Sequence, residues 1–494
     1  MPSPKIRWAI FLTLALLALA VRLPQLGDRP MHTDEAINAY ITGDLLAGEK
    51  YHYDPQDRHG PVLYLLAKPI AQLCGAKNFA GLTETELRLT PVIIGSAMIL
   101  LFGAAVEMFG FIPCLVAALL FAFAPLPVYY SRYFIHETLF VAATFGLMLA
   151  GWYTLKTNST GLAALTGLCA ALLLACKETA VIHFFALAAA AFAGWLATSR
   201  KQFPTPRVLA TSFVVFIIAS ILLFTWGGQN WPALTGLLHA VPRFAARAGG
   251  EGHEKSFGYY FQVLDPLFIY FLVALAGIYT AICDAVSGTR KSSLPLIVYA
   301  ALTFLIYSAI PYKTPWLALN LWLPLALLCG LGVEAIWLEA TQATGRWIIA
   351  VAFAALLLTA GQQTKVFVFD KPVDEKNPYA YAHTTEDLLR LPPRLEELAK
   401  AGNLAQPRIA VVAADAWPLP WYLRKFSQVG FWQPDQETGP ADFFITTTDV
   451  PDKLGERLKS YRPEYFGVRP NALLVLWTPQ PAATNAATPT PAQP

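Results

Sequence analysis

The chain has 494 residues, of which 55% are hydrophobic and only 14% are charged, and its mean hydropathy is +0.46. A composition this apolar is rare among soluble proteins and favours an integral membrane protein. The formal net charge of +3 is too small to indicate a nucleic-acid partner. The six cysteines are scattered without CxxC spacing, so they indicate apolar packing rather than a disulfide framework or a cysteine metal site.

Apolar runs long enough to cross a bilayer recur along most of the chain. A transmembrane helix needs about 20 mostly apolar residues. Lys5 and Arg7 before the first run resemble the start of a signal peptide, but no small-residue cleavage site follows it. We therefore expect a retained first helix and further spans after it, at residues 7–23, 88–108, 112–129, 137–155, 161–176, 178–198, 208–226, 264–284, 294–310, 316–338 and 346–363.

The short loops between these spans differ in charge between the two sides of the membrane. Lysine and arginine in short loops mark the cytoplasmic side. With the N-terminus inside, the inner segments carry Lys5, Arg7, Lys156, Arg200, Lys201, Arg207, Arg290, Lys291 and Arg346. This orientation predicts a multi-pass membrane protein with a cytoplasmic N-terminus and a C-terminal domain on the outer side of the membrane.

The first outer loop, residues 24–87, contains two further helical segments. Apolar residues recur with helical spacing in Asp34–Gly48, which ends at a glycine. The apolar stretch Pro61–Gly75 is short for a span and is interrupted by Lys68 and Pro69. We expect both helices to lie at the membrane interface, joined by the turn-rich segment "YHYDPQDRHGP".

The composition changes after Gly361, and residues 364–480 predict a small α/β domain after a transmembrane domain of residues 1–363. Three apolar segments are typical of strands: Arg408–Ala413, Asp442–Thr447 and Asn471–Thr478. Helices are expected at His383–Gly402, interrupted at Pro392 and Pro393, and in "WYLRKF" and "DKLGERL". Residues 481–494 are of low complexity and are expected to be disordered. The predicted fold is a multi-pass α-helical membrane protein with a small C-terminal α/β domain.

Two adjacent carboxylates, Asp34 and Glu35, follow His32 at the start of the first outer helix. One interpretation is structural, because acidic side chains at a helix N-terminus interact favourably with the helix dipole. The other is chemical, because one carboxylate can act as a general base, or the pair can hold a divalent cation such as Mg²⁺ or Mn²⁺. The residues alone leave both interpretations open.

A second acidic position, Glu137, follows Arg132 and His136 at the mouth of the fourth span. The structural interpretation is an Arg–Glu ion pair at the membrane interface. The functional interpretation makes Glu137 a carboxylate that faces the first pair across an outer cavity, where it adds a ligand for a cation. In that case Arg132 binds phosphate through its planar guanidinium group.

Other cations lie on the same predicted outer face. Arg58 and His59 precede the second interfacial helix, Lys177 lies next to Glu178 between two spans, and Lys313 lies in "PYKTPW". Ordinary turns and interfacial ion pairs explain such residues equally well. The functional interpretation makes them ligands of an anionic lipid headgroup, because charges near apolar helix ends are costly unless they are paired or used.

The long outer loop at residues 227–266 carries a further charged run with several glycines. Its members are Arg243, Arg247, His253, Glu254 and Lys255. We interpret this run as a solvated face, in a loop long enough to form a mobile lid.

Several motifs together resemble one family. A first span, then "HTDEA", two interfacial helices, "RHGPVLY" and a second acidic motif "RYFIHE" resemble GT-C glycosyltransferases, among them protein O-mannosyltransferases and lipid A aminoarabinose transferases. Within this superfamily, "CKET", "PYKTPW", "YAHTTEDL" and "WPLPWYLR" are most similar to membrane proteins named flippase activity-associated. The family's acidic pair in the first outer loop matches Asp34 and Glu35, whereas Gly60 replaces one proline of the aminoarabinose transferase pattern.

The resemblance implies an enzyme that moves a sugar from a polyprenyl-phosphate donor to a glycan, lipid or protein acceptor on the outer face. It implies catalytic roles for Asp34, Glu35 and Glu137, with a divalent cation as a further candidate for these three carboxylates. The expected donor-phosphate ligands are Arg58, His59, Arg132, Lys177 and Lys313, and the expected substrate contacts are His32, His136, Glu178, Tyr312 and Trp316.

Two other functions stay open at this stage. A transporter or flippase subunit would bind the same lipid-linked sugar without chemistry, although the sequence has few mid-span charges and no inverted repeat. A non-catalytic assembly scaffold would tolerate loss of both carboxylates.

Overall fold

The structure is a computed structural model that describes residues 2–55, 58–197, 203–250, 252–265, 268–290, 292–450 and 452–480. Arg200, Lys201, Lys291 and the tail at 481–494, all part of the sequence-based predictions, lie outside the described residues. The chain divides into two compact units. The first, here called the helical unit, comprises Met1–Asp28 and Ile41–Tyr381, and the second, the sheet unit, comprises Arg29–Tyr40 and Ala382–Pro494.

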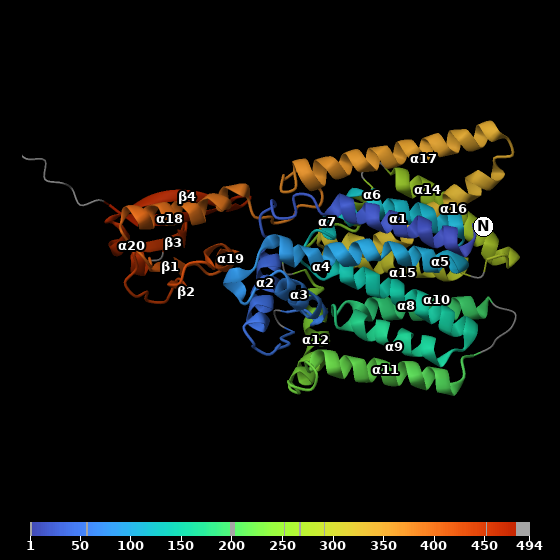
Figure 1. Cartoon of the computed structure of the whole chain (residues 1–494), viewed down its shortest axis with the longest axis horizontal. Coiled ribbons are helices and arrows are strands. Elements are labelled where there is room, and N and C mark those ends of the chain that lie inside the picture. The colour runs from blue at the N-terminus through green and yellow to red at the C-terminus, as the bar shows by residue number, and fades with distance from the viewer. Residues whose placement is uncertain are drawn as a thin grey trace, which may run out of the picture. The chain divides into compact units, whose positions relative to one another are not determined.

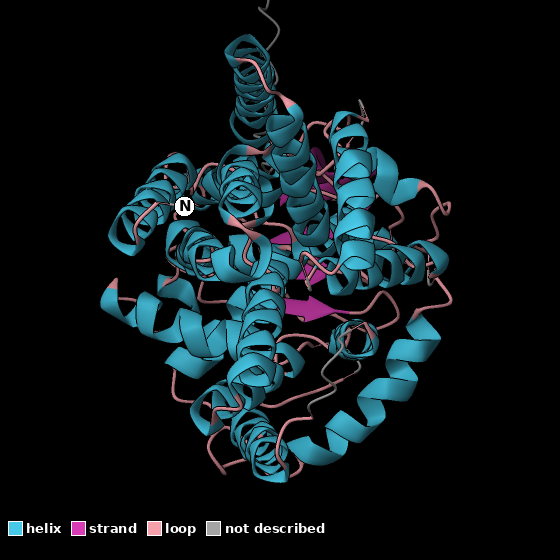
Figure 2. Cartoon of the chain, turned by 90° about the vertical axis from the view of Figure 1, so that its right-hand side faces the viewer, coloured by secondary structure: helices cyan, strands magenta, loops and turns pink. Residues whose placement is uncertain are grey.

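The helical unit is a bundle whose long helices have roughly parallel axes (Figure 1). Figure 2 shows it from the end that carries the N-terminus. Its elements are α1 (Pro4–Arg22), α3 (Val62–Leu73), η1 (Phe79–Gly81), α4 (Glu84–Ala97), α5 (Ile99–Phe109), α6 (Phe111–Phe123), α7 (Pro125–Tyr130), α8 (Glu137–Thr157), α9 (Thr160–Leu174), α10 (Ala180–Leu196), α11 (Pro206–Phe224), α12 (Ala233–Arg247), α13 (Tyr259–Leu264), α14 (Ile269–Ser287), α15 (Ser293–Ala309), η2 (Pro315–Leu317), α16 (Ala318–Glu339), α17 (Ala343–Thr364) and η3 (Lys365–Asp370).

The predicted spans coincide with these helices. Among the described residues, seven helices are long and apolar enough to cross a membrane: α1, α4 with α5, α8, α11, α14, η2 with α16, and α17 with η3. The other predicted spans fall on the shorter apolar helices α6, α9, α10 and α15, and Pro61–Gly75 contains the short helix α3. The prediction of a multi-pass helical fold is confirmed.

Glycines let the backbones of neighbouring helices approach closely. A Cβ atom on Gly277 of α14 would lie 1.9 Å from the carbonyl oxygen of Leu328 in α16. A Cβ atom on Gly332 of α16 would lie 2.1 Å from the carbonyl oxygen of Val273 in α14. Apolar helices gain little from burying one another in lipid, so close packing of small residues stabilises their association. A larger residue at either glycine would force α14 and α16 apart.

Charged side chains at one end of the bundle pair with one another. Lys156 lies 2.9 Å from Glu107, and Arg290 lies 2.6 Å from Glu334. Both Arg290 and Glu334 are neighbours of Gly110, which follows α5. In Figure 1 α5 ends on the side that carries the N-terminus, whereas α3, α7 and α12 lie toward the opposite end of the unit.

The sheet unit contains one five-stranded sheet in the order β2-β1-β3-β5-β4. Its strands are β1 (Ile409–Val412), β2 (Val429–Trp432), β3 (Phe443–Thr447), β4 (Tyr461–Arg469) and β5 (Ala472–Pro479). The first three are parallel to one another, whereas β5 is antiparallel to both β3 and β4. The helical elements of this unit are η4 (Glu386–Arg390), α18 (Leu391–Ala401), α19 (Leu419–Leu423) and α20 (Asp452–Leu458).

The three predicted strands correspond to β1, β3 and β5, and "DKLGERL" forms α20. Strands β2 and β4 were not predicted. The expectation that Pro392 and Pro393 interrupt a helix was wrong, because α18 begins at Leu391 and both prolines lie in its first turn, where a missing N–H costs no hydrogen bond.

Helix α2 (Thr33–Leu46) is the one described helix that is shared by both units. Its residues up to Tyr40 belong to the sheet unit, and its residues from Ile41 belong to the helical unit. The predicted carboxylate pair therefore belongs to the sheet unit.

Candidate active site

The start of α2 uses Glu35 as part of its own fold. The Glu35 carboxylate accepts a hydrogen bond from the backbone N–H of His32 at 3.2 Å, which is one half of a capping box. Its other oxygen lies 3.2 Å from Nη2 of Arg29. The Glu35 side chain is fully buried, so its charge is stabilised by these contacts rather than by water.

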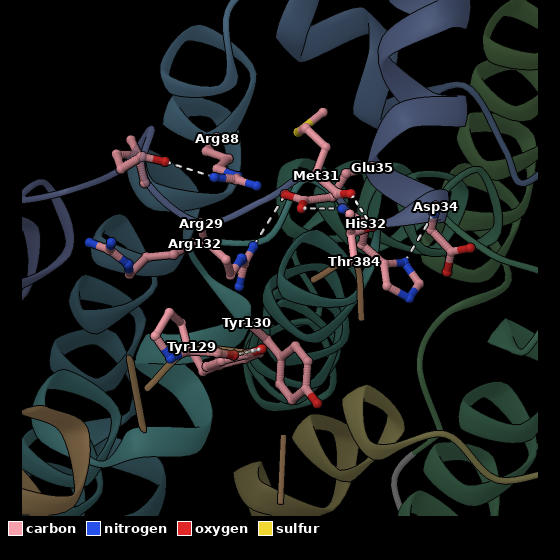
Figure 3. Close-up of polar contacts among 12 residues, drawn as sticks. Arg29, Met31, His32, Asp34, Glu35, Arg88, Tyr129, Tyr130, Arg132 and Thr384 are labelled. Carbon is pink, nitrogen blue, oxygen red and sulfur yellow. Dashed lines mark hydrogen bonds and ion pairs between the residues drawn. The ribbon is translucent and has the colours of Figure 1, made fainter. Parts of the chain in front are cut away.

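Asp34 differs from its neighbour in both direction and surroundings. Its backbone N–H donates to Nδ1 of His32 at 3.1 Å, while its carboxylate points to the other side of the helix start from that of Glu35 (Figure 3). Asp34 is only half-buried. Among the described residues, no cation lies within ion-pair distance of the Asp34 carboxylate. The two carboxylates therefore differ, because Glu35 is engaged by Arg29 and the His32 N–H, whereas Asp34 forms no ion pair among the described residues.

The segment before Asp34 is fixed by residues from the C-terminal part of the sheet unit. The Met31 N–H donates to the Tyr422 hydroxyl at 2.8 Å, and the Met31 carbonyl accepts from Thr384 at 2.7 Å. Arg469 donates to the Thr33 hydroxyl at 2.9 Å. The sequence did not single out these three partners, although "YAHTTEDL" and "WPLPWYLR" contain two of them.

In the helical unit, two consecutive half-buried residues between α9 and α10 form ion pairs. Nζ of Lys177 lies 2.6 Å from the Glu137 carboxylate, and Nδ1 of His59 lies 2.8 Å from that of Glu178. The Tyr53 hydroxyl donates to Glu178 at 2.8 Å. Burial opposes both charges, but the Glu137 carboxylate raises the pKa of Lys177, and His59 and Tyr53 lower the pKa of Glu178 to about 2.

Gly60 brings these loops together. A Cβ atom at this position would lie 2.2 Å from the Ala175 carbonyl oxygen, and the same carbonyl accepts the Val62 N–H at 3.2 Å. The Gly60 carbonyl in turn lies 3.1 Å from Nε2 of His136, whose pKa burial lowers well below the usual value. Proline also carries a Cβ, so the close approach explains why this chain has glycine where the resembling pattern has proline.

Three of these paired residues, His59, Lys177 and Glu178, line a cavity rich in cations. Arg58, Tyr312 and, from α12, Arg243 and Arg247 also line it. Arg243 and Arg247 are four residues apart on one helix, so both reach the same side of α12. We expected these two arginines to belong to a solvated face; in the structure they are half-buried and line the cavity.

Comparisons with known proteins show what this architecture resembles. No protein-family model matches the sequence, and neither does any curated protein. Among solved structures, ArnT from Cupriavidus metallidurans bound to undecaprenyl phosphate matches with a TM-score of 0.63 at 15% identity, over 94% of this chain and 97% of that chain. The chain has the GT-C fold. The narrower resemblance to flippase activity-associated proteins stays a prediction.

Two further solved structures share this GT-C fold. The oligosaccharyltransferase AglB from Archaeoglobus fulgidus, in complex with an inhibitory peptide and a dolichol-phosphate, matches with a TM-score of 0.56 at 12% identity over 94% of this chain and 74% of that chain. The arabinofuranosyltransferase AftD from Mycobacteria matches with a TM-score of 0.52 at 16% identity, over 98% of this chain and 40% of that chain.

Arg132, a predicted phosphate ligand, is bound by backbone carbonyls. Its guanidinium donates to the carbonyls of Arg22 at 2.6 Å, of Gln25 at 3.0 Å and of Pro24. Its side chain is buried and also covers the ring of Phe369. These contacts hold the segment after α1 in place, so we do not include Arg132 in the proposed phosphate site.

Replacing Arg132 by methionine is expected to destabilise the helical unit by about 3 kcal/mol, because buried carbonyls lose their donor. Thermal unfolding of the purified protein measures this, and donor affinity per folded molecule should not change. The matched control is Arg207→Met, at an exposed arginine at the start of α11. A wild-type Tm with weakened donor binding in Arg132→Met would instead assign Arg132 to the site.

Lys313 lies in the loop after α15 with its side chain bound by backbone oxygens. It donates to the Lys255 carbonyl at 3.2 Å and to that of Ile310, and burial lowers its pKa. Tyr312 borders the cavity, whereas Trp316 packs against Tyr133, with ring centroids 6.4 Å apart. Of these three residues, the structure brings only Tyr312 to the cavity.

A divalent cation does not fit the predicted carboxylates as they are arranged. No group of three or more His, Cys, Asp or Glu side chains among the described residues is placed to hold a metal ion. Glu35 pairs with Arg29, and Glu137 pairs with Lys177. The archaeal oligosaccharyltransferase has been crystallised with zinc and sulfate, but we derive no step through a metal in this chain.

The depressed pKa of Glu178 predicts a pH-dependent contribution to stability. Because the folded-state pKa is about 2 and the ordinary value is 4.5, the stabilisation is complete above pH 4.5 and is lost as the pH falls toward 2. Glu178→Gln should therefore cost about 2 kcal/mol at pH 7, and its Tm should approach that of wild type below pH 4.5. Glu107→Gln, which breaks an exposed pair, should show neither effect.

Proposed function

We propose that this protein is a membrane glycosyltransferase that moves a sugar from a polyprenyl-phosphate donor to an acceptor hydroxyl. The observation that carries the proposal is that the two units of the GT-C fold hold different chemical groups. The helical unit holds a cavity lined by cations, and the sheet unit presents one available carboxylate, Asp34, at the start of α2. These are the two chemical groups that the reaction needs.

The donor phosphate is proposed to bind the cationic cavity. Arginine recognises phosphate oxygens through a planar fork, and Arg58, Arg243 and Arg247 supply three such groups. Lys177 adds a point charge, and its buried pair with Glu137 fixes its position. When the bond to the sugar breaks, negative charge develops on the departing phosphate, and fixed cations in a poorly solvated cavity stabilise that charge.

The acceptor side of the reaction is proposed to use Asp34 as general base. The acceptor oxygen forms a bond to the anomeric carbon as the bond from that carbon to the phosphate oxygen breaks. The acceptor proton moves to the Asp34 carboxylate, and the lipid phosphate leaves as the anion. The Glu35 carboxylate has no place in this step, because Arg29 and the His32 N–H already engage it.

The proposed orientation puts the N-terminus in the cytoplasm and the reaction on the outer face. Lys156 and Arg290 lie at the same end of the bundle as the N-terminus, as the distribution of positive charge across membranes requires. Helix α12, which lines the cavity, lies toward the other end (Figure 1). A donor in the outer leaflet would then reach the cavity laterally from the lipid.

The test is an assay in proteoliposomes with donor lipid extracted from the producing cells and labelled in the sugar. An enzyme converts the donor to free polyprenyl phosphate and moves the label to a second molecule. A flippase carries the label across the membrane while the sugar stays on the lipid. Translocation of intact donor without any release of polyprenyl phosphate would overturn the proposal.

A further inference from the structure

The sheet unit contains a cleft that is separate from the cationic cavity of the helical unit. Its volume is about 790 Å³, within the range of about 300–1,000 Å³ that is typical of small-molecule sites. Its lining includes residues that follow the carboxyl ends of the three parallel strands, together with residues of β4 and β5. Asp415 and Trp417 follow β1, Asp435 follows β2, and Asp449 follows β3.

The topology explains why a cleft forms at this edge. In the order β2-β1-β3, the chain leaves β1 toward β2 on one side and returns to β3 on the other side of β1. The loops that follow β1 and β3 therefore diverge, and in open α/β sheets ligands bind in the crevice at such a switch point. The cleft of this protein lies where that rule places a ligand.

The polar lining of the cleft offers hydrogen-bond acceptors. The carboxylates of Asp435, Asp449 and Asp452 form no ion pair among the described residues. Both cations of the lining are engaged by the protein itself, since Lys453 donates to the Asp435 carbonyl at 2.6 Å and Arg469 donates to the Trp417 carbonyl at 2.8 Å. Ionised carboxylates accept hydrogen bonds only, so the matching ligand carries donors.

The rest of the lining is apolar. Trp417, Leu419, Val450 and Leu474 contribute to it, and Trp417 is half-buried, with part of its surface exposed. Aromatic and aliphatic surface next to carboxylates suits a ligand with many hydroxyl groups and apolar C–H faces. The same carboxylates repel a phosphate, which separates this cleft in chemistry from the cationic cavity.

The cleft is connected to the candidate base within the same unit. Arg469 lines the cleft, and its Nη2 lies 2.9 Å from the Thr33 hydroxyl, one residue before Asp34. The ring of Trp417 packs edge-on against that of Tyr40 in α2, with centroids 6.1 Å apart. A ligand in the cleft is therefore held by residues that also position the start of α2.

We propose that this cleft binds the acceptor, a neutral or amino-bearing carbohydrate chain. The role as acceptor rests on the proposed transfer reaction, whereas carbohydrate binding in the cleft does not. The aspartates accept hydrogen bonds from the sugar hydroxyls, and Trp417 with the apolar lining covers a sugar face. An anionic carbohydrate is excluded by the carboxylates.

The experiment measures carbohydrate binding to the full-length protein in lipid nanodiscs, without donor. The probes are neutral gluco-, manno- and galacto-oligosaccharides and oligomers of N-acetylglucosamine and glucosamine, followed by saturation-transfer NMR. At least one probe should bind wild type, and Asp435→Asn with Asp449→Asn should bind it about tenfold more weakly or worse. The matched control Glu396→Gln changes an exposed carboxylate of the same unit outside the cleft and should bind like wild type.

Two results would overturn the proposal: no binding of any probe by wild type, or equal binding by wild type and the double variant. The sugar-release assay separates this proposal from the proposed function. Carbohydrate binding that depends on Asp435 and Asp449, in a protein that never cleaves the donor, would remove the transfer reaction and leave the carbohydrate site in place.

Discussion

An Asp34→Asn variant is expected to transfer sugar about 10²–10⁴ times more slowly than wild type, because a positioned general base contributes about that factor. Asparagine keeps the shape of the side chain and a polar group at the start of α2. Its amide, however, cannot take the proton from the acceptor hydroxyl. The Asp34 carboxylate makes no ion pair among the described residues, so the Tm should stay within about 1 °C of wild type. Steady-state rates with labelled donor, together with thermal unfolding, measure both quantities.

The neighbouring variant Glu35→Gln provides the contrast. It leaves the Arg29 guanidinium buried without its carboxylate, so we expect a loss of about 3 kcal/mol in stability. Glutamine at position N3 of a capping box can still accept a hydrogen bond from the His32 N–H. The folded fraction of this variant should therefore transfer sugar at a rate near that of wild type. Wild-type turnover in the Asp34→Asn, Glu35→Gln double variant would end the assignment of either carboxylate to catalysis.

Neutralising the arginines of the cationic cavity is expected to produce the second large effect. Arg58→Gln should lower kcat/KM for the donor about 10–100-fold, the range for losing a hydrogen bond to a charged group. Arg243→Gln and Arg247→Gln should act in the same direction, since both side chains line the same cavity. Because these arginines are proposed to stabilise the negative charge that develops on the departing phosphate, kcat should fall together with kcat/KM.

Two controls test whether the effect depends on the position of the arginine and on more than its charge. Arg207→Gln removes an exposed arginine that does not line the cavity and should leave kcat/KM unchanged. Arg58→Lys keeps the charge but loses the planar fork, so it should restore activity only in part. Wild-type kcat/KM in the triple variant of Arg58, Arg243 and Arg247 would show that the phosphate binds elsewhere.

The membrane part of the fold could be predicted from the sequence because hydropathy carries it directly. Each predicted span falls on a helix, since a long apolar segment has few alternatives in lipid. In the sheet unit, the buried strands β1 and β3 have continuous apolar runs and were found. Strands β2 and β4 form the two edges of the sheet, and β4 has exposed residues and a proline, Pro463. Strand β2 has only four residues, one of them glycine, and β4 mixes exposed and buried residues, so neither gives a clear strand pattern in the sequence.

The candidate site was predictable in its members but not in their division of roles. Asp34 and Glu35 look alike in sequence, and only the contacts of Arg29 and His32 with Glu35 tell them apart. In the sequence, Arg132 has the features of a phosphate ligand. Its actual partners are backbone carbonyls, and such contacts leave no signature in a sequence. Arg243 and Arg247 did carry a signal, because their spacing fits a helix where we expected a loop.

The anomeric configuration of the product tests the central claim most directly. Direct attack by an acceptor hydroxyl, with Asp34 as base and phosphate as leaving group, inverts the anomeric carbon, whereas a covalent sugar–enzyme intermediate retains its configuration. Purified protein would be supplied with a donor of known configuration, and the transferred sugar would be analysed by NMR. We expect inversion in every product molecule. Retention of configuration, or recovery of the donor chemically unchanged, would contradict it.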